Sequence, residues 1–161
     1  MKIVILGAGR IGGSLARNLS NSNYEVCVVD ENKSRLSELE DRLDIMTVEG
    51  SASHLKTLKK SNLDKESIIL AVTSNDEVNI VACQIAKKFF HVKKTICRFK
   101  DNSYFENLDI FGEGVIDIPI SPEDEITTHL KELIDHPGAN QIESFANGKV
   151  KLVSVKAKKK G

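Results

Sequence analysis

The sequence predicts an α/β fold, a doubly wound parallel sheet of six strands. Short apolar runs alternate with longer amphipathic segments, which is typical of repeated strand–helix–strand units. Several of the short runs, such as 3–6 and 26–29, are apolar at consecutive positions, as expected for strands covered by helices on both faces. The strands are expected at Lys2–Leu6, Val26–Asp30, Ile45–Val48, Ser67–Val72, Thr95–Arg98 and Val115–Ile118.

The segments between the strands carry apolar residues at helical spacing. The first two such segments, 11–19 and 32–43, repeat Leu or Ile every three or four residues, at Ile11, Leu15 and Leu19 and at Leu36, Leu39 and Leu43. Because strand–helix–strand connections are almost always right-handed, this order predicts a Rossmann-like domain over residues 1–120.

Residues 121–161 are expected to form a crossover helix and a short β-hairpin. Ser121 is placed as a helix cap, Pro122 and the acids that follow suit a first turn, and we expect the helix to end near Asp135. Asn147-Gly148 predicts a type I′ turn between two strands. An isolated hairpin is marginal in water, so this one either leans on another chain or on residues absent here, or packs on the parent domain.

Composition excludes several classes of protein. The chain has 161 residues, enough for one domain, and its 23 basic and 23 acidic side chains give a formal net charge of zero, unlike a globally basic nucleic-acid binder. No apolar run reaches the roughly 18 residues of a membrane span, and the first ends at Leu6, short of a signal-peptide core of about 7 to 15 residues. Cys27, Cys83 and Cys97 form no CxxC pair. We therefore expect a cytoplasmic protein with no disulfide, no metal site, no nucleic-acid partner and no direct membrane insertion.

The first strand runs into a glycine-rich turn that precedes a helix. The turn consists of Gly7, Ala8, Gly9, Arg10, Ile11 and Gly12, which is the GxGxxG pattern in its strand–turn–helix setting. Gly7 permits the tight turn, Gly9 lets the backbone approach a pyrophosphate, and Gly12 allows the helix to pack closely on the strand. Main-chain amides at the helix start, including those of Arg10 and Ile11, would hold the anion. A glycine turn without a ligand is the alternative.

Asp30 ends the second strand, eighteen positions beyond Gly12. A carboxylate at this place can accept hydrogen bonds from both ribose hydroxyls of an adenosine. A 2′-phosphate beside it would meet a like charge, at a cost of up to about 4 kcal/mol at 4 Å and an effective dielectric near 20. Asp30 therefore favours NAD or an adenine nucleotide over NADP, unless it is only a solvated acid at a strand end.

Other candidate residues follow the third, fourth and fifth strands, whose carboxyl ends share the same sheet edge. Small residues at Gly50, Ser51 and Ala52 could line a base, with Ser53 equally suited to capping the next helix. Thr73 and Ser74 could offer hydroxyls and amides to a sugar or phosphate, and Asp76 is preferred as a helix cap. Arg98 could bind a phosphate or an acid across a subunit boundary, or form only a surface salt bridge. The four histidines fall in no triad, so no catalytic residue is assigned.

These motifs together resemble a known family. The matching segments are KIVILGAGRIGGSLA at 2–16, Asp30, Gly50–Ser53, AVTSNDEVN at 71–79, Cys97-Arg98, SPED at 121–124 and Pro137–Ala139. They resemble the TrkA family, the cytosolic nucleotide-binding subunits of bacterial Trk potassium uptake systems, which belong to the domains that regulate potassium conductance (RCK or KTN domains). Two positions depart from the family pattern: Ser51, where Asp or Asn is common, and Cys97, where Ala is usual.

The resemblance implies roles for the candidate residues. It implies that Gly7 to Ile11 hold phosphates, Asp30 the ribose, Thr73 and Ser74 the other side of the ligand, and Arg98 a phosphate. Relatives bind NAD, NADH, ATP or ADP. Full-length members contain two such halves, each with a small C-terminal domain, so residues 121–161 would lead into a truncated or missing domain.

The resemblance also implies a regulatory subunit that does no chemistry on its ligand. It would gate a membrane-embedded Trk-type potassium transporter through a conformational change of a homo-oligomer, a dimer or higher, at the inner face of the plasma membrane. Two alternatives remain. One is the cofactor domain of an NAD-dependent dehydrogenase, although too few residues follow the sixth strand to build a substrate domain. The other is a nucleotide sensor on a different transporter or channel.

Overall fold

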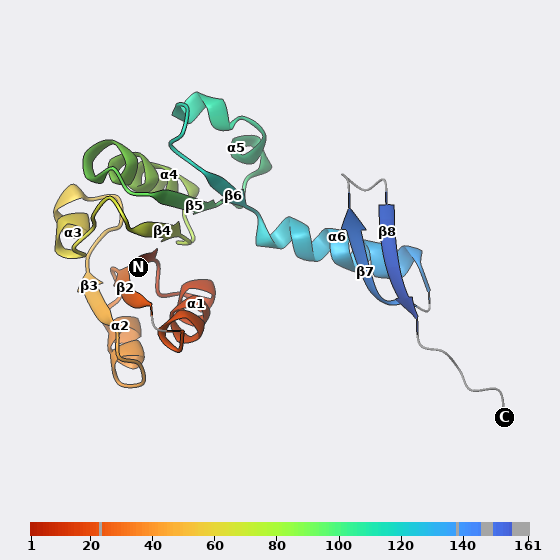
Figure 1. The fold of residues 1–161 in the computed structure, drawn as a ribbon, viewed down its shortest axis with the longest axis horizontal. Helices are drawn as coiled ribbons and strands as arrows, with labels where there is room; N and C mark the ends of the chain where they lie inside the picture. Colours follow the sequence, from red (N-terminus) through yellow and green to blue (C-terminus); the bar gives the residue numbers. More distant parts are fainter. Residues whose placement is uncertain (23, 138, 146–149, 156–161) are drawn as a thin grey trace. The chain divides into compact units, whose positions relative to one another are not determined.

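Six parallel strands form one sheet in the order β3-β2-β1-β4-β5-β6 (Figure 1). The computed structural model describes residues 1–22, 24–137, 139–145 and 150–155. The strands are β1 (Lys2–Leu6), β2 (Glu25–Asp30), β3 (Met46–Glu49), β4 (Ile68–Ala71), β5 (Lys94–Arg98) and β6 (Ile118–Ile120). The chain leaves β1 toward β2 and later returns to its other side with β4, so the order reverses between β1 and β4. The predicted Rossmann-like fold class is confirmed.

Helices cover both faces of this sheet. On one face of β1, Ile3 and Ile5 belong to a core cluster that includes Leu36 and Leu39. On the opposite face, Val4 belongs to a second cluster that includes Leu58 and Ile80. The first cluster lies under α1 (Arg10–Ser20) and α2 (Lys33–Glu40), and the second under α3 (Leu55–Lys60), α4 (Asp76–Ile85), the π-helical turn η1 (Ala86–Phe90), α5 (Asn102–Glu106) and the 3₁₀ turn η2 (Leu108–Phe111). Consecutive apolar residues in β1 and β2 are therefore explained by burial on both sides.

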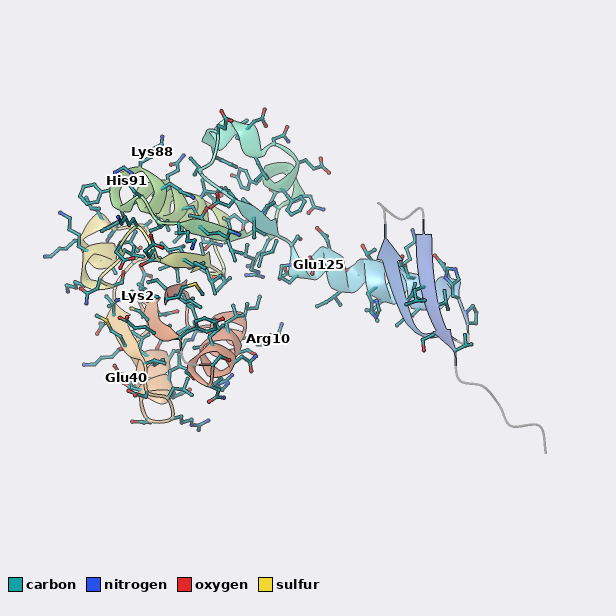
Figure 2. All side chains as sticks on the ribbon, viewed as in Figure 1. Lys2, Arg10, Glu40, Lys88, His91 and Glu125 are labelled. Atoms are coloured by element: carbon teal, nitrogen blue, oxygen red, sulfur yellow. The ribbon has the colours of Figure 1, made fainter. Side chains whose placement is uncertain are left out.

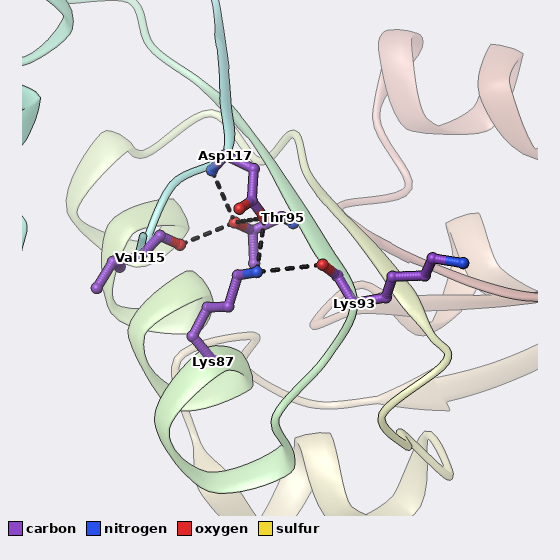
Figure 3. A network of polar contacts seen from close by, with 5 residues as sticks. All are labelled: Lys87, Lys93, Thr95, Val115 and Asp117. Carbon is purple, nitrogen blue, oxygen red and sulfur yellow. Dashed lines mark hydrogen bonds and ion pairs between the residues drawn. The ribbon is translucent and has the colours of Figure 1, made fainter. Parts of the chain in front are cut away.

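The sixth strand begins three residues later than predicted and ends two residues later. The prediction of Val115–Ile118 is wrong: β6 spans Ile118–Ile120, and Ile118 pairs with Ile96. Residues 115–117 are instead held by side-chain contacts to β5 (Figure 3): Thr95 Oγ1 donates to Val115 O at 2.8 Å, and Asp117 Oδ2 accepts from Thr95 N at 2.7 Å. A strand through Pro119 is tolerated because β6 is an edge strand.

An ion pair completes this network. Lys87 Nζ lies 2.7 Å from Asp117 Oδ2 and donates to Lys93 O at 3.3 Å (Figure 3). Partial burial raises the pKa of Asp117, but hydrogen bonds from Lys87 and Thr95 outweigh this effect, so the net pKa is below the ordinary value. The residue that precedes β6 is therefore held in place by its own charged side chain, the carboxylate of Asp117.

The chain divides into two compact units, Met1–Ser121 and Pro122–Gly161. In the second unit, α6 spans Pro122–Asp135, as predicted, and is followed by β7 (Ala139–Phe145) and β8 (Val150–Val155). These two strands pair antiparallel. The turn predicted at Asn147-Gly148 lies outside the described residues. Among the helices of the described ranges, none is long and apolar enough to cross a membrane.

Candidate functional site

Gly7 and Gly12, the first and third glycines of the motif between β1 and α1, lie too close to neighbouring backbone to carry a side chain. Gly7 has φ +105°, and an ideal Cβ on it would lie 3.0 Å from Thr73 Cα in the loop after β4. A Cβ on Gly12 would lie only 1.8 Å from Gly7 O. A Cβ on Gly9, in contrast, would have no atom within 4 Å. The first and third glycines are thus used for internal packing, and the second borders open space.

The start of α1 carries main-chain donors beside that open space. Gly9 is the N-cap of α1 and supplies no side-chain hydrogen bond, and the amide of Gly13, within α1, donates to Gly9 O at 2.8 Å. The first amides of a helix have no acceptor within the helix, and its dipole favours an anion there. Arg10 is exposed and Ile11 is half-buried. This arrangement can bind an anion without help from a side chain.

Asp30 lies against the glycine loop. Its Oδ2 accepts from Ala8 N at 2.6 Å, and its Oδ1 accepts from Asn32 N at 2.7 Å. The ends of β1 and β2 are therefore held together by one carboxylate. Each oxygen of an ionised carboxylate has a second lone pair, so Asp30 can still accept hydrogen bonds from a ligand. Its proposed role as a ribose acceptor is compatible with this geometry and stays a prediction.

The loop after β4 is organised by Asn79, which the sequence analysis did not single out. Asn79 is fully buried on α4; its Oδ1 accepts from Thr73 N at 3.0 Å and from Thr73 Oγ1 at 2.6 Å. Its Nδ2 donates to Thr73 O at 3.3 Å and to Arg98 O at 3.0 Å. Asn79 falls on the same helical stripe as buried Cys83 and Ala86, and a lone amide in an apolar stripe is the signal that could have identified it.

The amide and hydroxyl of Thr73 both have partners inside the protein, and its role as a ligand contact stays a prediction. Its amide and hydroxyl both bond to Asn79, and its hydroxyl also accepts from Asn75 N at 3.2 Å. Ser74 is exposed and stays a candidate for the ligand. Arg98 is buried, with 7% of its surface exposed, and its Nη1 donates to Thr73 O at 3.0 Å. The structure thus brings Arg98 to the same sheet edge as the glycine loop.

The helix cap predicted at Asp76 is wrong. The cap of α4 is Asn75, whose side chain accepts from Val78 N at 2.7 Å, whereas Asp76 is the first helical residue. Asp76 is buried and its Oδ2 accepts from the amides of Lys100 and Asp101, each at 2.9 Å. It therefore ties the start of α4 to the loop after β5, a non-local contact that sequence spacing does not reveal.

The segment after β3 reaches the candidate site mainly through its backbone. Gly50 N donates to Asp30 O at 2.9 Å, which places this segment next to the end of β2. Ala52 is buried in the core, and Ser51 and Ser53 hydroxyls lie 3.2 Å apart. Of the two alternatives for Ser53, the helix cap is excluded, because the N-cap of α3 is His54 and no side chain caps the helix. A base-lining role for Gly50, Ser51 and Ala52 stays a prediction.

The cysteines supply no nucleophile near this edge. All three are fully buried. Burial raises the pKa of Cys27 to about 11, and a hydrogen bond with Cys83 together with burial raises the pKa of Cys97 far above its ordinary value. In the part of the chain that the structure describes, no three metal-binding side chains gather. The groups at this edge that can contact a ligand are the main-chain amides at the start of α1 and the Asp30 carboxylate.

Comparison with known proteins shows which family the chain belongs to. The TrkA-N domain matches residues 3–122, which run from the second residue of β1 to the residue after Ser121 and include the glycine loop. The chain belongs to the TrkA-N domain family. A relative, the Trk system potassium uptake protein TrkA of Halomonas elongata, is 44% identical over 159 residues, covering 98% of this chain and 35% of the relative. The chain thus spans about a third of the length of the curated relatives it matches.

Solved structures share the fold of this family member. The TrkA-N domain of the inner membrane protein ybaL from Escherichia coli superposes with a TM-score of 0.70 at 21% identity, covering 83% of this chain and 96% of that one. The GsuK channel bound to NAD gives 0.62 at 22% identity, covering 78% and 22%. GsuK bound to ADP also gives 0.62, at 23% identity and covering 74% and 31%. At these identities the likeness shows the architecture.

Proposed function

We propose that this chain is a nucleotide-binding regulatory domain of a potassium transport system. The relative in Halomonas elongata belongs by name to a potassium uptake system, and a GsuK structure contains NAD. In this proposal the chain binds NAD(H) or an adenine nucleotide and performs no chemistry on it. Occupancy of the site then shifts the arrangement of paired domains and thereby the flux through a membrane-embedded transporter.

The observation that carries the proposal is the loop from Gly7 to Gly12. Gly9 faces open space, α1 has no side-chain cap, and the Asp30 carboxylate lies beside Ala8. A pyrophosphate at the start of α1 would receive main-chain hydrogen bonds, and Asp30 would accept those of the adjoining ribose. NAD, NADH, ATP and ADP all present these two groups, and GsuK structures hold NAD and ADP.

Nucleotide binding is tested by isothermal titration calorimetry and thermal unfolding with NAD, NADH, ATP, ADP and NADP in parallel. A ligand at one hundred times its Kd adds about 2.7 kcal/mol to the free energy of unfolding. Gly9→Ala should abolish binding, because the new methyl group enters the space that the phosphates need. Asn18→Ala, on the exposed side of α1, is the matched control. Absence of heat and of thermal stabilisation with all five ligands would refute the proposal.

A second copy of the chain is proposed to pack on α6. Ile126, Leu130 and Ile134 recur every four residues, so they lie on one side of the helix, and they are 62%, 54% and 75% exposed. Burying such a stripe in a dimer holds two nucleotide-binding domains together. A ligand can then shift the relative arrangement of these domains, provided that the ligand binds one arrangement more tightly than the other. The proposal extends to a homo-oligomer that attaches to its transporter at the membrane's inner face.

Sedimentation velocity tests the dimer. We expect a dimer at tens of micromolar, and Leu130→Asp should convert it to a monomer with unchanged circular dichroism. Thr128→Asp, on the other side of α6, adds the same charge and should leave the dimer intact. A wild-type chain that sediments as a monomer with and without NAD would contradict this part of the proposal.

A further inference from the structure

A groove lined by arginines runs between α1 and α2, beside the glycine loop. It has a volume of about 280 Å³, and its arginines are Arg10, Arg17, Arg35 and Arg42. The two helices approach each other at Gly13 of α1, where an ideal Cβ would lie 3.8 Å from Leu39 Cδ2 of α2. Figure 2 labels Arg10 on the first of these helices.

The choice of basic residue in this groove is selective. The sequence contains five arginines, and four of them line the groove; the other 18 of its 23 basic residues are lysines, and no lysine lines it. Both residue types carry one positive charge, so a merely charged surface would not distinguish them. Guanidinium groups differ by presenting several N–H donors in a planar fork that matches the oxygens of a phosphate.

These guanidinium groups have no acidic partner within the described residues. The ion pairs found there join Lys2 with Glu25, Lys87 with Asp117, and Lys93 with Glu66. Glu38 also lines the groove, yet it forms an ion pair with none of the four arginines there. The groove therefore combines four positive charges with one negative charge and holds its hydrogen-bond donors ready for an anion.

The size of the groove limits the anion. Sites for whole drug-sized ligands occupy about 300–1,000 Å³, so this groove suits a phosphate or pyrophosphate group and not a complete dinucleotide. It shares Ala8, Gly9 and Arg10 with the glycine loop and continues from there toward Arg17 and Arg42. We propose that the groove is a second anion subsite, which binds a phosphate group beyond those held at the start of α1.

Two sources can supply this phosphate. It belongs either to the nucleotide on the glycine loop or to a free phosphate or pyrophosphate ion. On the nucleotide it is a terminal phosphate, or a 2′-phosphate where the groove arginines offset the like charge of Asp30. The nucleotide-borne source rests on the proposed function, whereas the free ion does not. Because the arginines are exposed, their contribution must fall with ionic strength.

The test is a calorimetric titration of the full chain with NAD, NADP, ADP, ATP and pyrophosphate. The double variant Arg17→Gln, Arg42→Gln removes two groove charges away from the glycine loop. We expect its affinity for NAD to stay within twofold of the wild type and its affinity for a ligand with the additional phosphate to fall at least fivefold. The pair Arg17→Lys, Arg42→Lys keeps the charge without the fork and should recover only part of that loss.

For a third variant we expect the opposite change in affinity. Glu38→Gln removes the negative charge from the groove and should raise the affinity for the same phosphate-bearing ligand at least twofold. Lys56→Gln, which removes one positive charge from α3 on the other face of the sheet, is the matched control and should change nothing. An effect seen only with NADP, only with ATP, or only with pyrophosphate identifies the source of the phosphate.

Failure of the two proposals is distinguishable. If the double variant and Glu38→Gln bind every phosphate-bearing ligand as the wild type does, the groove subsite is refuted, and NAD binding to the glycine loop is unaffected. If no nucleotide binds but pyrophosphate does so in a groove-dependent manner, the proposed function fails and the subsite stands. If nothing binds, both are overturned.

Discussion

Substitution of Gly12 by alanine tests the packing of the glycine loop most directly. The added Cβ would lie 1.8 Å from Gly7 O, whereas Cβ contacts under 3.0 Å are essentially never seen. The helix start and the turn must therefore separate by at least 1.2 Å, the difference between these two distances. The opposing atom is backbone, so no side-chain rotation can relieve the contact.

The expected magnitude follows from two opposing effects. Overpacking costs about 1–3 kcal/mol, and a rigid backbone neighbour places this site at the top of that range or above it. Replacing glycine by alanine inside a helix stabilises the helix by up to about 1 kcal/mol. The net loss is about 2 kcal/mol, which for a chain of this size corresponds to a fall in Tm of about 4–8 °C.

The assay is thermal unfolding followed by circular dichroism, with Gly9→Ala as the partner variant. A Cβ on Gly9 meets no atom within 4 Å, so this variant should unfold within about 2 °C of the wild type. Gly12→Ala should thus lose stability and Gly9→Ala should lose only ligand binding. A Tm for Gly12→Ala equal to that of the wild type would refute the described contact between α1 and the end of β1.

Three further predictions concern other parts of the first unit. Asn79→Ala leaves the polar backbone groups of Thr73 and Arg98 without their buried partner. The free energy of unfolding, measured in urea, should therefore fall by about 2–4 kcal/mol. A loss under about 1 kcal/mol would contradict the hydrogen-bond network around Asn79. Because the folded pKa of Asp117 is depressed, its contribution is present above the unfolded pKa and disappears as pH falls through the folded value below 3.8. The stability gap between wild type and Asp117→Asn, measured in urea, should therefore be full at pH 6 and shrink below pH 4; a gap that does not change with pH speaks against the ion pair. Burial and a pKa raised to about 11 should keep Cys27 unreactive toward a thiol reagent at pH 8 until the chain is unfolded, and rapid labelling of the native protein at this residue would show that the core is open.

The sequence was sufficient for the fold class and for the position of the glycine loop, because strand burial and turn chemistry are local patterns. Consecutive apolar residues in β1 and β2 indicated strands buried on both faces, and the confirmed α6 was marked by Pro122 and the acids after it. The spacing of Gly7 and Gly12 likewise reflects a turn whose sterics involve neighbours close in the chain, although the contact with Thr73 is distant.

The tertiary structure decided the contacts between segments far apart in the sequence. Asp76 resembled a cap by position, but it accepts hydrogen bonds from a loop 24 and 25 residues away, and Asn75 takes the cap. The start of β6 was set by Thr95 and Asp117, 22 residues apart, which no local pattern encodes. Periodicity and turn chemistry report what a segment does with its immediate neighbours, whereas polar groups at the end of a strand find partners only once the sheet has placed other strand ends beside them.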